Sequence, residues 1–316
     1  MALSSTPDLQ KLFAGDRVSV AHLISAVENG AVGSEELLKQ IFFRTGRSYR
    51  IGITGPPGAG KSTITNRLTR YYRQKGLTVG IIAVDPTSPF TGGALLGDRV
   101  RMSDVEMDEG VFIRSMASRG SLGGLSKKTI EAADVLDASG KDIVIMETVG
   151  VGQSELDIAG AADTTVVVLV PESGDSIQAM KAGLMEIADF FVMNKSDRAG
   201  ADQAVMSIKM ILGIRKNKAW NPDVVKAVAS EGIGTEEIAS MIANHRTYLE
   251  KDGGLVAKRR RRFEDRVREL VADTLHVDFW TEERVALLSG KMDILMQKQS
   301  TPYDVARELV LHFRNQ

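Results

Sequence analysis

The stretch IGITGPPGAGKSTITN, residues 51–66, decides how the middle of the chain folds. It fits the pattern G-x-x-x-x-G-K-[ST] and stands between an apolar, strand-like run and a helix-like run, which is the context that a phosphate-binding loop needs. Glycines permit backbone conformations that a Cβ would oppose, so successive N–H groups can converge on one anion, and the following helix adds its positive N-terminal end. Lys61 can reach the β- and γ-phosphates, and the Ser62 hydroxyl can coordinate Mg²⁺. The stretch predicts a nucleoside triphosphate site formed by Gly55, Pro56, Gly58, Ala59, Gly60, Lys61, Ser62 and Thr63.

Composition limits the other classes of function. The chain has 316 residues, of which 43% are hydrophobic, so it can bury a sizeable core. Its formal net charge of −1 argues against a general nucleic-acid binder. There are no cysteines, which excludes disulfides, thiolate nucleophiles and zinc–sulfur sites. The 4 histidines are too scattered in the sequence to predict a metal cluster.

The sequence also predicts where the protein works. No apolar run approaches the roughly 20 residues that a membrane helix needs. The start, MALSSTPDLQKLFAGD, lacks a basic region followed by an apolar region, and it lacks the arginines of a transit peptide. We therefore expect a cytoplasmic protein with no membrane partner.

Strand-like and helix-like runs alternate over residues 48–245, and this alternation predicts a doubly wound, mainly parallel α/β sheet. Several of the strand-like runs are nearly continuous in Val and Ile, as expected for parallel strands that are covered on both faces. In such sheets ligands bind at the carboxyl ends of the strands. The predicted strands are Arg50–Thr54, Thr78–Val84, Val111–Ser115, Asp142–Met146, Thr164–Val170, Phe190–Met193 and Val224–Val228.

A helical extension, residues 1–47, is expected before this core. Val18, Leu23, Ile24 and Val27 recur at helical spacing, and Ser34 resembles the N-cap of a further helix. A partner-docking lobe is one interpretation, but we favour a helical layer packed on the sheet.

The third predicted region, residues 246–316, is helical as well. It contains the basic run KRRRR at residues 258–262, followed by Phe263, Val267, Leu270 and Val271 at helical spacing. A basic run that opens an amphipathic helix is more often a solvated face or a partner surface than a nucleic-acid site. Thr301-Pro302 predicts the start of a last helix.

Acidic residues at predicted strand ends are candidates for a metal shell. Asp85 and Asp98 lie on the glycine-rich stretch after the second strand, and Mg²⁺ prefers such hard oxygen ligands, although Asp85 could instead only cap the turn before Pro86. Glu147 stands where many nucleotide hydrolases place the acidic residue of the metal-binding strand. Gly150 follows, and its N–H could meet a γ-phosphate and report its loss, as in an order–disorder switch. A role for Gln153 in orienting water is doubtful, because it does not directly follow Gly150.

The sequence NKSD, residues 194–197, predicts which base is bound. The carboxylate of Asp197 can accept from guanine N1–H and from the 2-amino group, whereas adenine would leave it unpaired. Sites that lose buried polar partners in this way can discriminate by about 10⁴-fold. Asn194 would read or brace the base edge, and the stem of Lys195 would cover the face of the base. Ser230 and Glu231, after another predicted strand, fit a second loop facing guanine.

The blocks DPTSPFTGGALLGDRVRM, ETVGVGQSE, PESGDSIQAMKAG and NKSD, spaced as they are after GPPGAGKS, resemble the MeaB/MMAA family. These proteins are G-protein chaperones of adenosylcobalamin-dependent acyl-CoA mutases and are sometimes labelled ArgK. The resemblance covers the whole predicted GTPase domain and also fits the helical flanks. It implies a SIMIBI-like fold, the dimerising class of P-loop GTPases, in which the C-terminal helical arm forms a homodimer.

The resemblance also implies a site and a function. It implies GTP and GDP as ligands, and Mg²⁺ surrounded by Ser62, Asp85, Asp98 and Glu147. Lys61, Asp85, Glu147 and Gly150 are the catalytic candidates. A loop at about residues 170–181 would couple nucleotide state to the mutase through Asp175 and Lys181. We expect slow GTP hydrolysis that the mutase accelerates, because no catalytic glutamine or arginine is obvious in the chain.

Alternatives remain at this point. A kinase acting on a transport protein is the reading that the ArgK label suggests. A nickel-inserting GTPase would need cysteines and clustered histidines, which the sequence lacks. No Asp-x-His-x-x-Gly cobalamin-binding pattern occurs, so contact with cobalamin should come through the partner. Methylmalonyl-CoA mutase is the default partner, while the isobutyryl-, ethylmalonyl- and hydroxyisobutyryl-CoA mutases remain open.

Overall fold

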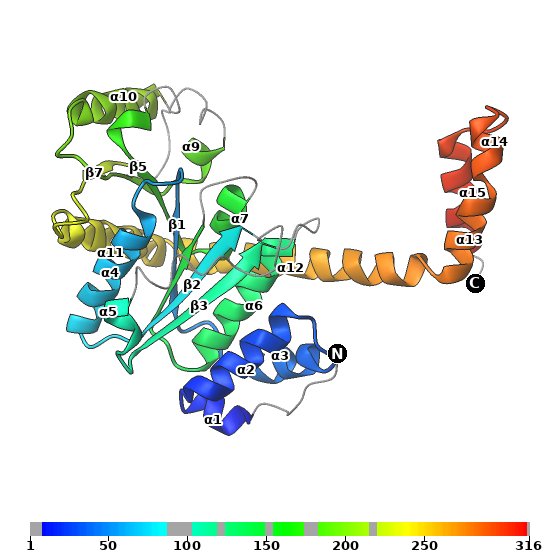
Figure 1. Ribbon diagram of the computed structural model, residues 1–316, viewed down its shortest axis with the longest axis horizontal. Coiled ribbons are helices and arrows are strands. Elements are labelled where there is room, and N and C mark those ends of the chain that lie inside the picture. Colours follow the sequence, from blue (N-terminus) through cyan, green and yellow to red (C-terminus); the bar gives the residue numbers. More distant parts are fainter. Residues whose placement is uncertain are drawn as a thin grey trace. The chain divides into compact units, whose positions relative to one another are not determined.

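The computed structural model (Figure 1) describes residues 8–86, 103–118, 124–148, 154–173, 183–214 and 220–314. The chain divides into two compact units, Met1–Lys258 and Arg259–Gln316.

The first unit is built on a sheet of seven strands in the order β3-β2-β4-β1-β5-β6-β7, and all neighbouring strands are parallel. The predicted α/β fold and all of the predicted strands are confirmed, with small differences at their ends. The first strand, β1, lies between β4 and β5, so the strand order reverses beside it and the loop after β1 opens at the ligand-binding crevice of such sheets. The strands are β1 (Tyr49–Thr54), β2 (Val79–Pro86), β3 (Val111–Ser118), β4 (Ile143–Glu147), β5 (Thr164–Leu169), β6 (Phe190–Met193) and β7 (Val224–Lys226).

Helices connect these strands as crossover elements. The described helices that begin in the first unit are α1 (Leu9–Phe13), α2 (Arg17–Glu28), α3 (Ser34–Phe42), α4 (Lys61–Gln74), α5 (Ser103–Glu106), α6 (Gly124–Ala138), α7 (Ser154–Ala161), the 3₁₀ turn η2 (Pro171–Ser173), α9 (Leu184–Ile187), α10 (Ala201–Ile214), α11 (Thr235–Lys251) and α12 (Gly254–Phe279).

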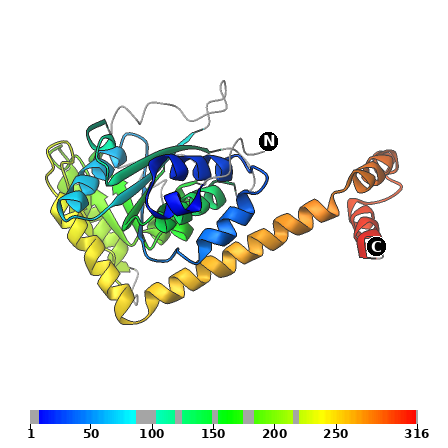
Figure 2. The same cartoon turned by 90° about the horizontal axis from the view of Figure 1, so that it is seen from below.

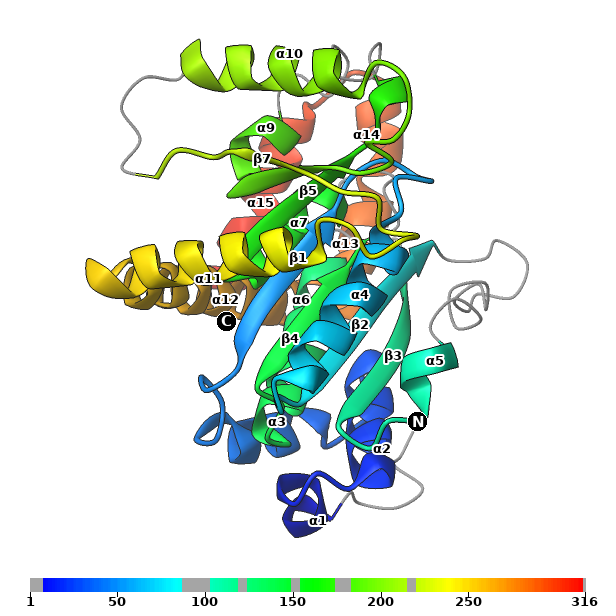
Figure 3. The same cartoon turned by 90° about the vertical axis from the view of Figure 1, so that its left-hand side faces the viewer.

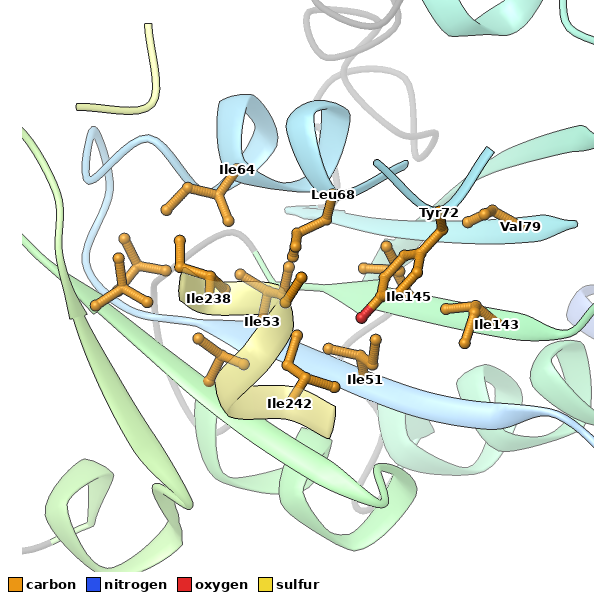
Figure 4. Close-up of a cluster of buried hydrophobic side chains, with 14 of the residues drawn as sticks. Ile51, Ile53, Ile64, Leu68, Tyr72, Val79, Ile143, Ile145, Ile238 and Ile242 are labelled. Carbon is orange, nitrogen blue, oxygen red and sulfur yellow. The ribbon is translucent and has the colours of Figure 1, made fainter. Parts of the chain in front are cut away.

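One face of the sheet is covered by α4 and α11, which lie in front of the strands in Figure 3. Alternate strand residues such as Ile51 and Ile53 point to this face, as the two-residue period of a strand requires. Figure 4 shows Ile64 and Leu68 of α4 packed among them together with Ile238 of α11. Since all five side chains are at most 2% exposed, the helix that follows the phosphate loop is fixed to the sheet by a dry core.

The opposite face is covered by α6, α7 and the N-terminal helices, which lie beside α6 in Figure 2. Leu23, Ile24 and Val27 are buried there, which confirms that the N-terminal segment is a helical layer, whereas Val18 is exposed. The expected capping role of Ser34 is wrong by one residue. Gly33 is the N-cap of α3 in the left-handed conformation and gives no side-chain cap, so Ser34 is the first helical residue. A third cluster joins β5 and β6 to α9 and α10.

The second unit is helical. It contains most of α12, followed by α13 (Glu282–Gly290), α14 (Met292–Met296) and α15 (Pro302–Arg314), the last beginning at the proline that predicted it. The guanidinium of Arg284 lies over the rings of Phe279 and Phe313, at 5.5 and 4.8 Å from their centres. The apolar stripe of α12 remains exposed, since Phe263, Val267 and other large side chains there keep 40% or more of their surface accessible.

Among the residues that the structure describes, no helix combines the length and the apolar character needed to cross a membrane.

Candidate functional site

The phosphate loop begins at the carboxyl end of β1 and ends at the first turn of α4, as its sequence predicts. Gly55, Gly58 and Gly60 all have positive φ, at +135°, +72° and +90°. At two of these positions a side chain would also clash with neighbouring atoms. A Cβ at Gly55 would lie 2.0 Å from the carbonyl oxygen of Val168, and one at Gly60 would lie 2.2 Å from the amide nitrogen of Asn194. The loop can therefore keep this shape only with glycine at these positions.

Lys61 is the first residue of α4 and is buried, at 6% exposure. Its ammonium donates to the carbonyl oxygens of Gly55 at 2.8 Å and Pro56 at 3.0 Å. The side chain therefore folds back across the loop and holds a positive charge over the glycine cradle. Of the remaining predicted loop residues, Ala59 is buried in the core and Thr63 is exposed on the first turn of α4.

Glu147 is the last residue of β4 and is only 4% exposed. One carboxylate oxygen accepts from the Ser62 hydroxyl at 2.5 Å, and the other accepts from the Thr65 hydroxyl at 2.9 Å. A hydroxyl and a carboxylate in contact are the hard oxygen donors that suit Mg²⁺. These residues therefore fit a magnesium ion beside the phosphate loop. Thr65 was not identified from the sequence, although its place one helical turn after Ser62 puts both hydroxyls on the same face of α4.

The other predicted metal and switch residues are only partly described. Asp85 belongs to β2 and lies two residues beyond Ala83, which pairs with Glu147, so Asp85 stands at the same carboxyl edge of the sheet. Nothing is described of its side chain. Asp98, Gly150, Gln153, Asp175 and Lys181 lie outside the described residues, and their expected roles stay predictions.

Asn194 joins three loops at this edge. It follows β6 and is 3% exposed. Its amide nitrogen donates to the carbonyl oxygen of Ala59 in the phosphate loop at 2.8 Å, and its amide oxygen accepts from the N–H of Ala229 at 3.0 Å. Asn194 therefore ties the phosphate loop to the loop after β7, and its expected role in reading or bracing the base edge stays a prediction. Lys195, with a φ of +56°, directs its ammonium to the carbonyl oxygen of Gly58 at 2.8 Å.

Asp197, Ser230 and Glu231 lie exposed near these braces. The loop that holds Asp197 is tied to the end of β7, because the N–H of Ser196 donates to the carbonyl oxygen of Ala227 at 3.0 Å. The same loop is also joined to Ala229, the neighbour of Ser230, because the N–H of Ala229 donates to the amide oxygen of Asn194. The structure thus brings the phosphate loop, the N-K-x-D loop and the loop after β7 together, as their sequence positions predicted.

Arg67 is a residue of this site that the sequence pattern did not reveal. It lies on α4, and its guanidinium donates to the carbonyl oxygens of Ala229 at 3.0 Å and Ser230 at 2.5 Å. These bonds join residues about 160 positions apart, and an arginine on a helix gives no local signal of them.

The chain is similar to a known protein family, to curated relatives and to a solved structure. Residues 20–284 match the family model described as methylmalonyl Co-A mutase-associated GTPase MeaB. The chain is 47% identical over 307 residues to a Pyrococcus horikoshii protein named as an inferred GTPase, covering 96% of each chain. It is 32% identical over 306 residues to the mouse methylmalonic aciduria type A homolog, mitochondrial, covering 89% of this chain and 73% of that protein. A crystal structure described as a LAO/AO transport system kinase superposes with a TM-score of 0.75 at 29% identity, covering 97% of this chain and 96% of the other.

Proposed function

The chain belongs to the family of methylmalonyl Co-A mutase-associated GTPases, MeaB, and is a GTPase that binds guanine nucleotides; from this premise we propose that it is a chaperone of an adenosylcobalamin-dependent acyl-CoA mutase. It would dock on the mutase, methylmalonyl-CoA mutase by default, and use GTP hydrolysis to gate the loading, protection and reactivation of the cofactor. We place this activity in the cytoplasm.

The observation that supports the proposal most directly is the pair of hydrogen bonds by which Asn194 joins Ala59 of the phosphate loop to Ala229 of the loop after β7. A single amide couples the parts that would hold the two ends of a nucleotide. A rearrangement of the phosphate loop on loss of the γ-phosphate would therefore be passed through Asn194 to the other loops of the carboxyl edge. A nucleotide-dependent switch requires such a connection.

The chemistry would be phosphoryl transfer to water, in which positioning and charge stabilisation supply most of the rate. The ammonium of Lys61 would exchange its bonds to the loop carbonyls for bonds to the β- and γ-phosphates. Ser62 and Glu147, with Asp85 and Asp98, would hold Mg²⁺. When bound, Mg²⁺ would neutralise charge on the phosphate oxygens.

At the other end of the nucleotide, Asp197 would accept from guanine N1–H and the 2-amino group. Ser230 and Glu231 would line the base on its other side, and the bonds of Asn194 would hold the two base loops in register. Lys195 would cover one face of the ring from its place beside Gly58.

We also propose that residues 246–316 form a homodimer. The support is the exposed apolar stripe on α12, where Phe263, Val267, Val271 and Leu275 recur every four residues and are each about half exposed. Burial of such a stripe against a second copy would stabilise the helix by removing apolar area from water.

The competing function is phosphorylation of a transport protein, which the description of the superposed crystal structure supports. The two functions differ in where the γ-phosphate goes. Hydrolysis releases labelled inorganic phosphate, whereas a kinase leaves the label on a protein acceptor.

The test is GTP turnover by the purified chain with and without its mutase, using γ-labelled GTP. We expect slow release of inorganic phosphate by the chain alone and at least about tenfold faster release with the mutase. A Lys61→Met variant serves as the control for contaminating hydrolases. Unchanged turnover with a mutase that demonstrably binds, or label on a protein acceptor, would contradict the chaperone proposal.

A further inference from the structure

Arg67 lies on a helix that is fixed to the sheet by buried side chains. It belongs to α4, which also carries Lys61 and Ser62, and the neighbouring side chains Ile64 and Leu68 are buried in the core against the sheet (Figure 4). Whatever Arg67 binds is therefore fixed relative to the phosphate loop.

The guanidinium of Arg67 binds two successive carbonyl groups. Nε donates to the oxygen of Ala229 at 3.0 Å, and Nη2 donates to the oxygen of Ser230 at 2.5 Å. A planar fork with fixed donors matches such a pair of acceptors better than the single ammonium of lysine does. The guanidinium also lies beside Gly232, where a Cβ would be 3.5 Å from Nη1.

These bonds set the direction of one backbone N–H. A trans peptide is planar, so its C=O and N–H point in opposite directions. Because the Ala229 carbonyl is held toward Arg67, the N–H of Ser230 in the same peptide unit is directed away from Arg67. The preceding N–H, that of Ala229, is already used by the amide oxygen of Asn194.

The N–H of Ser230 has no hydrogen-bond partner within the described part of the chain. Ser230 is exposed, so this donor is accessible to a ligand. An N–H that faces position 6 of the base can distinguish guanine from adenine. Guanine has an oxygen there that can accept the hydrogen bond, whereas adenine has an amino group that is itself a donor. A donor facing a donor leaves both groups unpaired.

We propose that Arg67 is a positioning residue for base recognition, which aims the N–H of Ser230 at the 6-oxygen of guanine. The proposal rests on the proposed position of the base beside Asn194 and Asp197. In this arrangement the carboxylate of Asp197 meets N1–H and the 2-amino group, and the part that Arg67 contributes is to hold the backbone on the opposite side of the same edge.

The test is a binding comparison of three nucleotides, GTP, 6-thio-GTP and ITP, with the full-length chain at one Mg²⁺ concentration. Sulfur at position 6 weakens the acceptor that Ser230 would meet, and ITP lacks the 2-amino group that Asp197 would meet. We expect the unmodified chain to prefer GTP over 6-thio-GTP by about fivefold, as for one neutral hydrogen bond. In Arg67→Met this preference should fall below about twofold. The GTP-to-ITP preference should stay unchanged.

Arg73→Met is the matched control. Arg73 lies on the same helix and binds the carbonyl oxygen of Leu77 at 2.9 Å and the carboxylate of Asp108, away from the base loops. This variant should lower the melting temperature without changing the ratio of the affinities for GTP and 6-thio-GTP. In Arg67→Lys the ratio should be restored in part, because one carbonyl can still be bound.

The outcomes separate the two proposals. A loss of affinity in Arg67→Met that is equal for all three nucleotides would overturn the positioning role and leave Arg67 a structural tie. If the unmodified chain binds ITP as tightly as GTP, the proposed position of the base beside Asp197 is wrong, and the role of Arg67 fails with it.

Discussion

The two edges of the sheet differ in how their buried polar groups are partnered. At the amino edge, the carboxylate of Asp137 accepts from the N–H groups of Gly46, Arg47 and Ser48 at 2.7–3.1 Å. It also lies 3.6 Å from the guanidinium of Arg50, which has a second partner in Asp134 at 2.5 Å. This edge is held by bonds within the protein that no ligand needs to replace.

At the carboxyl edge, the buried polar groups hold one another in ways that a ligand could take over. The ammonium of Lys61 is bound to carbonyls of its own loop, and the Ser62 hydroxyl is bound to Glu147. Phosphate oxygens and a metal ion offer these groups stronger partners, because charge-assisted bonds exceed neutral ones. Burial of polar groups alone therefore does not identify a binding site. What identifies it is that the buried groups have partners that a ligand could replace.

The largest effect that would sharpen this comparison is expected from Asp197→Asn. The amide can no longer accept from both guanine donors, so we expect GTP affinity to fall by up to about 10⁴-fold. Xanthosine triphosphate should be spared, since its 2-oxo group suits an amide donor. The check is equilibrium binding of both nucleotides together with thermal unfolding, which should not change because Asp197 is exposed. Equal losses for the two nucleotides would mean that Asp197 does not read the base.

The next largest effect is expected for a substitution at the amino edge, and it is an effect on stability. Arg50→Met removes the partner of two carboxylates, of which Asp137 has a side chain only 1% exposed. Breaking a buried ion pair on one side costs about 3–5 kcal/mol. We expect the free energy of unfolding in urea to fall by this amount, while the folded fraction still binds GTP.

Lys39→Met is the control for this prediction, because Lys39 pairs with Glu35 on the surface, where both side chains are more than 60% exposed. That change should cost less than about 1 kcal/mol. If Arg50→Met proved equally mild, the buried pairs of the amino edge would not be the structural ties described above.

The smallest effect concerns pH. Burial is the main cause that lowers the pKa of His245 below its ordinary value of 6.5. Its Nδ1 is 2.8 Å from the Thr164 hydroxyl, its Nε2 is 3.4 Å from Asp189, and Lys258 lies beside the same carboxylate. The folded state therefore binds this proton less readily than the unfolded state, and the stability that His245 contributes is complete above pH 6.5 and is lost as pH falls below it.

The slope from this group can be no steeper than about 1.4 kcal/mol per pH unit. Urea unfolding at pH 7.5 and at pH 5.5 measures it, and His245→Gln should flatten the difference. A His245→Gln variant with the same pH dependence as the unmodified chain would assign the effect to other groups.

The strands and the loops at their ends could be predicted because their signals are local. Val and Ile runs mark the strands of a covered parallel sheet, and the glycines of residues 55–60 mark a loop that only glycine can form. The bonds by which Asn194 joins two loops were not predicted, since its partners lie in loops far away in the sequence. Arg67 could not be identified for the same reason, because packing alone decides which helix side chains face a distant loop, whereas Thr65 had a local sign in its place one helical turn after Ser62. The cap at Ser34 was misplaced because Gly33 can begin a helix without a side-chain bond.

The most direct test of the central claim, that GTP is hydrolysed at the carboxyl edge, is turnover by Glu147→Gln. The substitution keeps the size of the side chain but removes the charge that faces Ser62 and Thr65. We predict that Mg²⁺-dependent GTP turnover falls by about 10²-fold or more, with a melting temperature equal to or above that of the unmodified chain. Turnover at the unmodified rate by a correctly folded Glu147→Gln protein would contradict the account.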